Sequence, residues 1–169
     1  AEADQLRLYE ALLEAAKQLG AGPVGSRALM SLRVEKGYGS WSREYSSEYW
    51  PQEVGLDQLV KTEKEFLHKS AYLAIKDNAP REVLSLIHVT DIDGADATGG
   101  EPIFLPDGTP VGRVTSGTYG YAVDMSLALG YLKDVSAGAQ VDVMILGKPH
   151  RGVVLAKPPF DPKGEKLRA

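Results

Sequence analysis

Hydrophobic residues recur at spacings of three and four through the first twenty positions, with charged residues between them. The apolar positions are Leu6, Tyr9, Leu12, Leu13, Ala16 and Leu19. This spacing is that of an amphipathic helix and predicts one over residues 4–19. Asp4 stands at its start as a candidate cap, and Gly20 lies just beyond its end.

A second, shorter helical pattern begins at Ser26, whose hydroxyl can cap the first turn, and ends near Glu35. Apolar residues between these two positions fall on one side at helical spacing. Gly37 and Gly39 follow directly and allow a sharp reversal of the backbone. Glu35 therefore lies where a helix ends and a flexible turn begins, so its side chain could face a cleft.

The stretch from residue 41 to residue 56 is rich in aromatic side chains and is broken by Pro51. Its aromatic residues after Trp41 are Tyr45, Tyr49 and Trp50. They could line a pocket for a flat ligand, or they could pack a long loop onto the body of the protein. Further on, the pattern predicts a short strand at Leu56–Val60 and a helix at Phe66–Ile75, which the Asn-Ala-Pro sequence ending at Pro80 terminates.

From Arg81 onward the chain consists of short runs of β-branched and aliphatic residues separated by glycine, proline and aspartate. The runs are V-L-S-L-I-H-V-T, P-I-F-L, V-G-R-V-T, S-L-A-L-G-Y-L, V-D-V-M-I-L-G and G-V-V-L-A. The sequence Pro106-Asp107-Gly108 is a strong hairpin signal. Several short strands at near-regular spacing predict a small antiparallel barrel or sandwich. We expect a domain boundary near Pro80.

Composition narrows the function classes. The chain has 169 residues, 43% of them hydrophobic and 25% charged, as in ordinary soluble globular proteins. A net charge of −4 without a basic stripe argues against a nucleic-acid partner. No run approaches the length of a membrane span, so we expect no membrane partner. The absence of cysteine excludes disulfides and thiolate chemistry and fits a reducing compartment, the cytoplasm or, in a eukaryote, the mitochondrial matrix.

Three motif searches give negative answers. Gly20–Gly25 matches G-x-G-x-x-G, but a helix precedes it where a dinucleotide fingerprint requires a strand. The acidic loop at residues 91–96 has its glycine misplaced for an EF-hand, and Pro102 stands where the last calcium ligand belongs. The histidines lie far apart, at His68, His88 and His150. We therefore expect no flavin or nicotinamide contact and no metal site.

The order of segments across nearly the whole chain nevertheless resembles a known family. The run L-R-V-E-K-G-Y-G-S-W is similar to the L-R-x-E-x-G signature of aminomethyltransferases, the T-protein of the glycine cleavage system. Further similar segments follow in the family's order: P-Q-E-V-G-L, E-F-L-H-K-S-A, V-G-R-V-T-S-G-T-Y-G, A-L-G-Y and P-P-F. The sequence around K-G-Y-G-S-W most resembles the folate-binding C-terminal region of FAD-dependent dimethylglycine and sarcosine dehydrogenases or oxidases.

The resemblance implies an α+β fold, a fragment of the T-protein fold. Residues 1–80 would be the end of the folate-binding middle domain, partly helical, and residues 81–169 the closing antiparallel β-barrel. It implies the tetrahydrofolate-binding part of a one-carbon transferase acting on a methylated amine, with FAD elsewhere in the full-length protein. Alternatives are a non-catalytic folate-binding or docking module, or a fragment of a stand-alone aminomethyltransferase or demethylase. The family's catalytic aspartate precedes these segments, so it would belong to an N-terminal part or a partner chain, and no catalytic residue is assigned here.

The resemblance also suggests a role for Glu35, which aligns with the family's pterin-binding glutamate. A carboxylate can accept the 2-amino and N3–H groups of a pterin together. The alternative is that Glu35 forms an ion pair with Arg33 or Arg43 at the helix end.

Four further residues are candidate folate contacts. Tyr38 and Trp41 could stack on a ring of the ligand or serve as packing residues. Lys61 and Lys64 could meet the glutamate tail, or they could be solvated loop lysines. The loop Thr115-Ser116-Gly117 matches the family pattern, and we expect it to form a tight hairpin.

Overall fold

The computed structural model describes residues 4–169, which divide into two compact units, one ending at Met30 and the other spanning Ser31–Ala169. The first unit contains α1 (Gln5–Gln18) and the first half of α2 (Ser26–Glu35). The predicted N-terminal helix is confirmed, but Asp4 at its N-cap makes no capping hydrogen bond with its side chain. No residue of α1 is buried, so its apolar face is exposed. The expected boundary near residue 80 stays a prediction.

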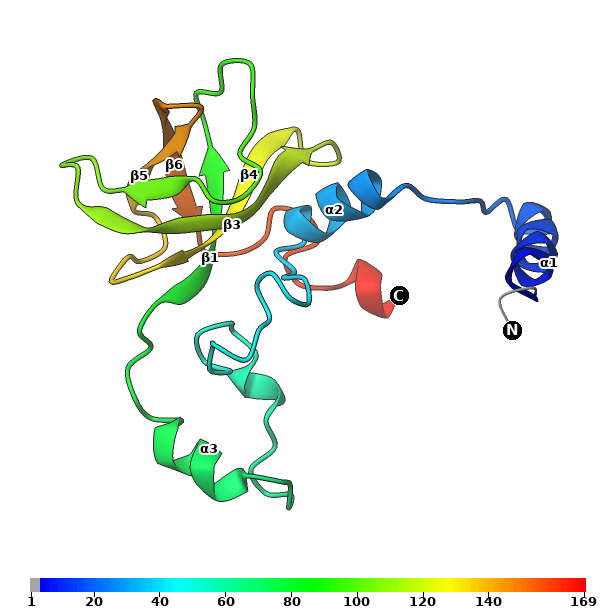
Figure 1. Ribbon diagram of the computed structural model, residues 1–169, viewed down its shortest axis with the longest axis horizontal. Coiled ribbons are helices and arrows are strands. Elements are labelled where there is room, and N and C mark those ends of the chain that lie inside the picture. The colour runs from blue at the N-terminus through cyan, green and yellow to red at the C-terminus, as the bar shows by residue number, and fades with distance from the viewer. Residues whose placement is uncertain (1–3) are drawn as a thin grey trace. The chain divides into compact units, whose positions relative to one another are not determined.

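The second unit is built on a closed antiparallel β-barrel (Figure 1). Its strands are β1 (Val83–Val89), β2 (Pro102–Phe104), β3 (Pro110–Gly120), β4 (Met125–Leu132), β5 (Gln140–Ile145) and β6 (Lys148–Leu155). The order around the barrel is β1-β4-β3-β2-β5-β6, and β1 pairs with β6 to close it. Each of the six predicted runs is a strand, which confirms the α+β class and the barrel.

The barrel interior is filled by aliphatic side chains, which come from the strands except for Ala97 in the loop between β1 and β2. They are Ile87, Val89, Ala97, Ile103, Val111, Val114, Ala128, Leu132, Val141, Val143, Ile145 and Val154. Strand β4 differs from the others because seven of its eight residues are buried. Its outer face is covered as well: Leu127 and Leu129 form a cluster with Val34 of α2, and Tyr131 stacks on Tyr49 with ring centroids 3.7 Å apart. The segment after α2 therefore packs on the outside of β4.

Two expectations for the loops are wrong in detail. The stretch at Leu56–Val60 contains a single 3₁₀ turn, η2 (Asp57–Leu59), because the closed barrel leaves no strand edge for it to pair with. The helix α3 (Lys69–Ile75) begins later than predicted because His68 takes a left-handed conformation with φ of 62°. A last 3₁₀ turn, η3 (Lys166–Arg168), lies near the C-terminus.

The Thr115-Ser116-Gly117 sequence is part of a strand and not a hairpin turn. It lies inside β3, which runs on to Gly120, and the register shifts beside it between Val114 and Ser116. The chain reverses after Gly120, and Asp124 takes a positive φ of 57° there. β3 is therefore long enough to reach α2, where the Ser31 hydroxyl contacts the carbonyl oxygen of Tyr119.

Two strands approach so closely at Gly112 that only glycine fits. A Cβ added there would lie 1.9 Å from the carbonyl oxygen of Tyr131 on β4. Real Cβ contacts do not reach that distance, so any other residue would force β3 and β4 apart.

None of the helices in residues 4–169 is long and apolar enough to cross a membrane.

Gly112→Ala should therefore lower the free energy of unfolding by about 1–3 kcal/mol or more, since the backbone must shift to accommodate the methyl group. Gly22→Ala is the matched control, because a Cβ there meets nothing within 4 Å and no positive φ is required. We expect it to change stability by less than about 1 kcal/mol. Urea denaturation followed by circular dichroism measures both variants, and equal stabilities would contradict the close approach.

Candidate functional site

Glu35 ends α2 and is buried, with 1% of its surface exposed, against the turn that joins β3 to β4. Its Oε1 accepts a hydrogen bond from the backbone N–H of Ala122 at 3.1 Å. The Ser31 hydroxyl, one helical turn earlier, lies 3.2 Å from the same oxygen and 2.7 Å from the carbonyl oxygen of Tyr119, and can donate its proton to either. The carboxylate is thus fixed between the helix and the hairpin.

The other carboxylate oxygen of Glu35 has no hydrogen-bond partner in the part of the chain that the structure describes. Oε2 is nevertheless buried. Arg33 forms an ion pair with Glu44 at 3.3 Å. An unpaired buried acceptor typically costs about 1–3 kcal/mol, so this oxygen calls for a physical explanation.

The hairpin approaches Glu35 this closely because residue 120 is glycine. A Cβ at Gly120 would lie 2.8 Å from the Cγ of Glu35 and 3.0 Å from a methyl group of Val123. The backbone N–H of Phe160 adds a contact from the other side by donating to the carbonyl oxygen of Glu35 at 3.2 Å. The C-terminal segment and the hairpin together hold the end of α2.

A second buried carboxylate, Glu44, ties the loop after α2 to β3. It accepts hydrogen bonds from the N–H of Ser40 at 2.7 Å, from Thr115 Oγ1 at 2.7 Å and from Ser116 Oγ at 2.6 Å, and it pairs with Arg33 at 3.3 Å. Burial by itself would raise the pKa of Glu44, but the three hydrogen bonds and the Arg33 charge outweigh it and lower the pKa. The ionised carboxylate is therefore the stable form.

A third carboxylate, Glu53, anchors the loop at the start of β1. Arg81 donates to it through Nε and Nη2, both at 2.7 Å, in a two-pronged ion pair. The N–H of Trp50 adds a hydrogen bond at 2.8 Å, and the guanidinium lies 4.8 Å from the Trp50 ring centroid. The Arg81 hydrogen bonds lower the pKa of Glu53 to about 2. Sequence reasoning did not single out Glu44 or Glu53, because their partners are distant in the chain.

Two hollows lie on the surface of the second unit and share Tyr49 as a wall. The apolar hollow has a volume of about 680 Å³ and is lined by Trp41, Ser42, Tyr45, Ser46, Ser47, Tyr49, Pro51, Val54, Leu56, Leu59 and Val60. The charged hollow has a volume of about 770 Å³ and is lined by Glu48, Tyr49, Arg81, Glu82, Arg113 and Lys133. Glu35 lines neither of them.

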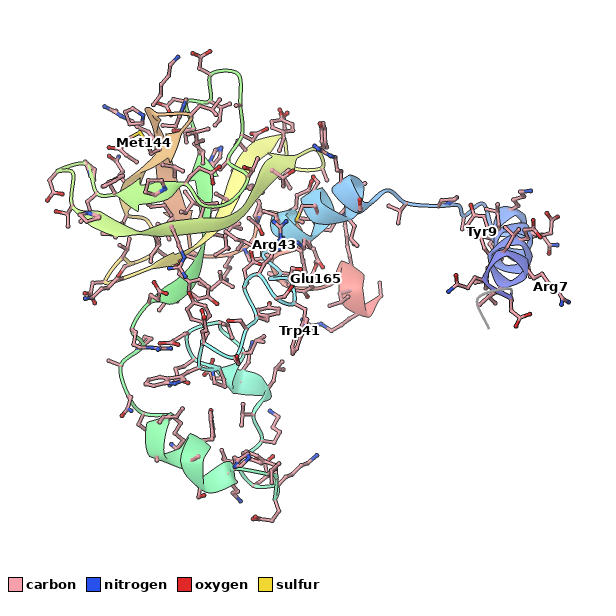
Figure 2. The ribbon with its side chains drawn as sticks, in the orientation of Figure 1. Arg7, Tyr9, Trp41, Arg43, Met144 and Glu165 are labelled. Atoms are coloured by element: carbon pink, nitrogen blue, oxygen red, sulfur yellow. The ribbon has the colours of Figure 1, made fainter. Side chains whose placement is uncertain are left out.

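The predicted folate contacts do not converge on one pocket. Trp41 is 84% exposed and lines the apolar hollow, and Figure 2 shows its side chain on the segment that follows α2. Tyr38 is exposed, with the ammonium group of Lys36 5.9 Å from its ring centroid. Lys61 is exposed and donates to the carbonyl oxygen of Gln58 at 3.1 Å, and Lys64 is exposed as well. No cluster of potential metal ligands occurs among residues 4–169.

Comparison with known proteins places this arrangement in a family. A model of the GCVT N-terminal domain matches residues 1–64, and a model of the glycine cleavage T-protein C-terminal barrel domain matches residues 84–161. The two matches follow one another along the chain and are separated by residues 65–83. The chain belongs to the glycine cleavage T-protein family. The first match ends inside the loop that carries Lys61 and Lys64, and the second covers the barrel.

Relatives in this family include a dehydrogenase, an oxidase and a probable aminomethyltransferase. The chain is 35% identical over 159 residues to mitochondrial dimethylglycine dehydrogenase from Mus musculus. This match covers 92% of the chain and 18% of the dehydrogenase. It is 31% identical over 172 residues to 4-methylaminobutanoate oxidase (formaldehyde-forming) from Paenarthrobacter nicotinovorans. This match covers 96% of the chain and 20% of the oxidase. It is 30% identical over 169 residues to a probable aminomethyltransferase from Thermococcus kodakarensis. This match covers 94% of the chain and 42% of that protein.

A solved structure agrees with this assignment. The glycine cleavage system aminomethyltransferase T from Bartonella henselae superposes with a TM-score of 0.73 at 26% identity, covering 82% of this chain and 40% of that protein. The chain therefore spans less than half the length of each of these T-protein family members.

The Glu53–Arg81 pair gives this region a defined response to pH. The pKa of Glu53 falls from its usual value of 4.5 to about 2 on folding, so the ionised pair stabilises the fold above about pH 4.5. This contribution is lost as the pH falls toward about 2. Glu53→Gln should lower stability near neutral pH and flatten the dependence of stability on pH between about 5 and 2.

Urea denaturation at several pH values measures this difference. Glu63→Gln, at an exposed position of the same loop region, is the control and should follow the unmodified chain. An unchanged pH slope in Glu53→Gln would show that the pair does not shift the pKa of this carboxylate.

Proposed function

We propose that the chain is the tetrahydrofolate-binding part of a one-carbon transferase, and that Glu35 binds the pterin. The observation that carries this proposal is the buried Oε2 of Glu35, which has no hydrogen-bond partner within residues 4–169. Two neighbouring N–H donors on a pterin edge match an acceptor with two lone pairs. A donor that reaches Oε2 would satisfy it in a site shielded from water, where such a bond is strong.

The surroundings of Glu35 suit a binding role because they leave the carboxylate little freedom. Ala122 and Ser31 engage Oε1, so the group is oriented before a ligand arrives. A preorganised acceptor loses less conformational entropy on binding than a mobile one. The ligand must displace part of the cover over Oε2, and the turn after Gly120 is the element that lies against the Glu35 side chain.

The role of the chain in the reaction follows from what its residues can do. Tetrahydrofolate supplies the N5 nucleophile that takes up the one-carbon unit. Glu35 would hold and orient the pterin, which is the positioning contribution to catalysis. Tyr38 and Trp41 would contact its rings, while Lys61 and Lys64 would face the glutamate tail. The acid–base step would belong to the catalytic aspartate, which we assign to the N-terminal part of the T-protein fold or to a partner chain.

The branch of the family remains a separate part of the proposal. We favour the C-terminal piece of an FAD-dependent N-methyl amine dehydrogenase or oxidase, because dimethylglycine dehydrogenase and 4-methylaminobutanoate oxidase match at 35% and 31% identity. FAD would then be bound elsewhere in the full-length protein. The substrate class would be a small methylated amine.

Glu35→Gln tests the pterin assignment without removing side-chain volume. The amide oxygen can still accept from Ala122, whereas the amide NH₂ would take the place of Oε2 and present donors to the donors of the pterin. We expect the affinity for tetrahydrofolate, measured by calorimetry, to fall about tenfold or more, since losing such a bond costs about 1–3 kcal/mol.

Glu101→Gln is the matched control for this experiment, because Glu101 accepts backbone hydrogen bonds from Thr98 and Gly99 in a loop of the barrel and plays no part in the proposed site. It should bind tetrahydrofolate as the unmodified chain does. Equal affinity in Glu35→Gln would remove Glu35 from the site, and absence of binding in every form would remove tetrahydrofolate as a ligand of this chain.

A further inference from the structure

Helix α2 ends in a Schellman motif that uses two of its last carbonyl groups. The N–H of Gly37 donates to the carbonyl oxygen of Val34 at 2.9 Å. The N–H of Tyr38 donates to the carbonyl oxygen of Arg33 at 2.8 Å. Gly37 takes the positive φ of 69° that this motif requires. The carbonyl group of Glu35 lies beyond both bonds, and a helix has no donor of its own for its last carbonyls, so its partner has to come from outside the helix.

The segment after β6 supplies that donor, and we call residues 156–169 the C-terminal strap. The N–H of Phe160 donates to the carbonyl oxygen of Glu35 at 3.2 Å. Pro158 lies close to the same helix end, since a Cβ added to Gly37 would come 3.4 Å from the Cβ of Pro158. Figure 1 shows the strap in red, running from β6 to the end of α2 and on to the C-terminus. The strap therefore contacts the residue to which we assign the pterin.

An ion pair between Lys36 and Asp161 fastens the strap to α2. The ammonium group of Lys36 donates to Oδ2 of Asp161 at 3.1 Å and also to the carbonyl oxygen of the same residue. The two side chains are only 13% and 6% exposed, so the pair is screened less than a surface pair. Removing one partner would leave the other charge nearly buried without its counterion. Lys36 directly follows Glu35 in the chain, so the pair acts on the backbone next to the candidate binding group.

Asp161 has the backbone conformation of a residue that is fixed by its contacts. Its φ is 46°, in the left-handed region that residues other than glycine rarely adopt. Its Oδ1 accepts hydrogen bonds from the N–H groups of Glu165 at 2.7 Å and Lys166 at 3.2 Å, which orders the rest of the strap. Its Oδ2 faces Lys36. Strained conformations of this kind persist where the surrounding contacts determine them. Asp161 thus joins the strap to α2 through two different oxygens.

We propose that Lys36 and Asp161 are positioning residues for Glu35, and that their ion pair holds the end of α2 in the orientation in which the carboxylate receives the pterin. The inference rests on the proposed function, which makes Glu35 the pterin contact. Ala122 and Ser31 hold the side chain of Glu35 at Oε1, while the strap holds the backbone of the same residue. A carboxylate that is fixed at both ends loses less freedom when a ligand binds.

Asp161→Asn tests this role because it breaks the ion pair and keeps the order of the strap. The amide oxygen can still accept from the N–H of Glu165, whereas the amide NH₂ would face the ammonium group of Lys36. We expect the affinity for tetrahydrofolate, measured by calorimetry, to fall about twofold to thirtyfold, as changes in residues without ligand contact do. Asp77→Asn is the matched control, because it makes the same change in an exposed ion pair with Lys76, and it should bind as the unmodified chain does.

Hydrogen exchange of the Phe160 N–H measures the hold on Glu35 without any ligand. In ¹⁵N-labelled protein this N–H should exchange about tenfold faster or more in Asp161→Asn, because the strap opens locally more often, and Asp77→Asn should leave it unchanged. Lys36→Arg keeps a cation with donors for Asp161 and should restore both exchange and affinity, whereas Lys36→Met should repeat the effect of Asp161→Asn. An unchanged exchange rate in Asp161→Asn would overturn the inference.

Gly112→Ala separates positioning from a general loss of stability. Gly112 lies near the start of β3, whereas Gly120 beside Glu35 ends that strand. At a temperature at which every variant is folded, Gly112→Ala should bind tetrahydrofolate as the unmodified chain does, although its free energy of unfolding is lower. A loss of affinity in Gly112→Ala equal to that in Asp161→Asn would show that stability alone controls binding, and would overturn the inference.

The Glu35 and Asp161 variants together distinguish failure of this inference from failure of the proposed function. Reduced affinity in Glu35→Gln with full affinity in Asp161→Asn would overturn the positioning role and leave the pterin assignment standing. Equal affinity of Glu35→Gln and the unmodified chain, or no binding of tetrahydrofolate by any form, would overturn the pterin assignment. The positioning role would then fall with it, even if the exchange of the Phe160 N–H changes as expected.

Discussion

The buried carboxylate of Glu44 is the interaction on which the arrangement of the second unit depends. It collects hydrogen bonds from Ser40, Thr115 and Ser116 and the charge of Arg33, so one anion joins α2, the following loop and β3. Removing the carboxylate would take this acceptor from the Ser40 N–H and from the buried Ser116 hydroxyl, and an unpaired buried donor costs more than a typical surface ion pair contributes. Tyr131 on β4 strengthens the same attachment, because it donates its hydroxyl proton to the carbonyl oxygen of Glu44 at 2.6 Å.

The attachment determines where the candidate binding group lies. With the end of α2 held on the barrel, Glu35 contacts the turn after β3. Its Oε1 lies within hydrogen-bond distance of the Ser31 hydroxyl and accepts from the N–H of Ala122, and these contacts stabilise the junction. The other oxygen, Oε2, has no hydrogen-bond partner among residues 4–169. We therefore propose that structural and binding roles belong to different oxygens of the Glu35 side chain. The relatives of the chain in the T-protein family, among them dimethylglycine dehydrogenase and aminomethyltransferases, act on methylated or aminomethyl groups by name.

The sequence predicted the elements better than their partners. Barrel strands such as β1 and β5 were recognisable because β-branched runs are separated by residues that favour turns. The full length of β3 was not recognisable, because the strand continues past a bulge beside Ser116 through a segment that contains turn-forming residues. The position of Glu35 at a helix end was predicted from local spacing. The role of Glu44 could not be predicted, because its partners Thr115 and Ser116 lie 71 and 72 residues away in the sequence. Only the closed barrel brings them together.

We propose that Glu35 offers one carboxylate oxygen to the pterin while the other stays bonded to the protein. A crystal structure of the chain with bound tetrahydrofolate would show this arrangement. We expect a pterin N–H within hydrogen-bond distance of Oε2, with Oε1 still accepting from Ala122. A pterin bound at another place, with Oε2 still covered and without a ligand donor, would contradict it.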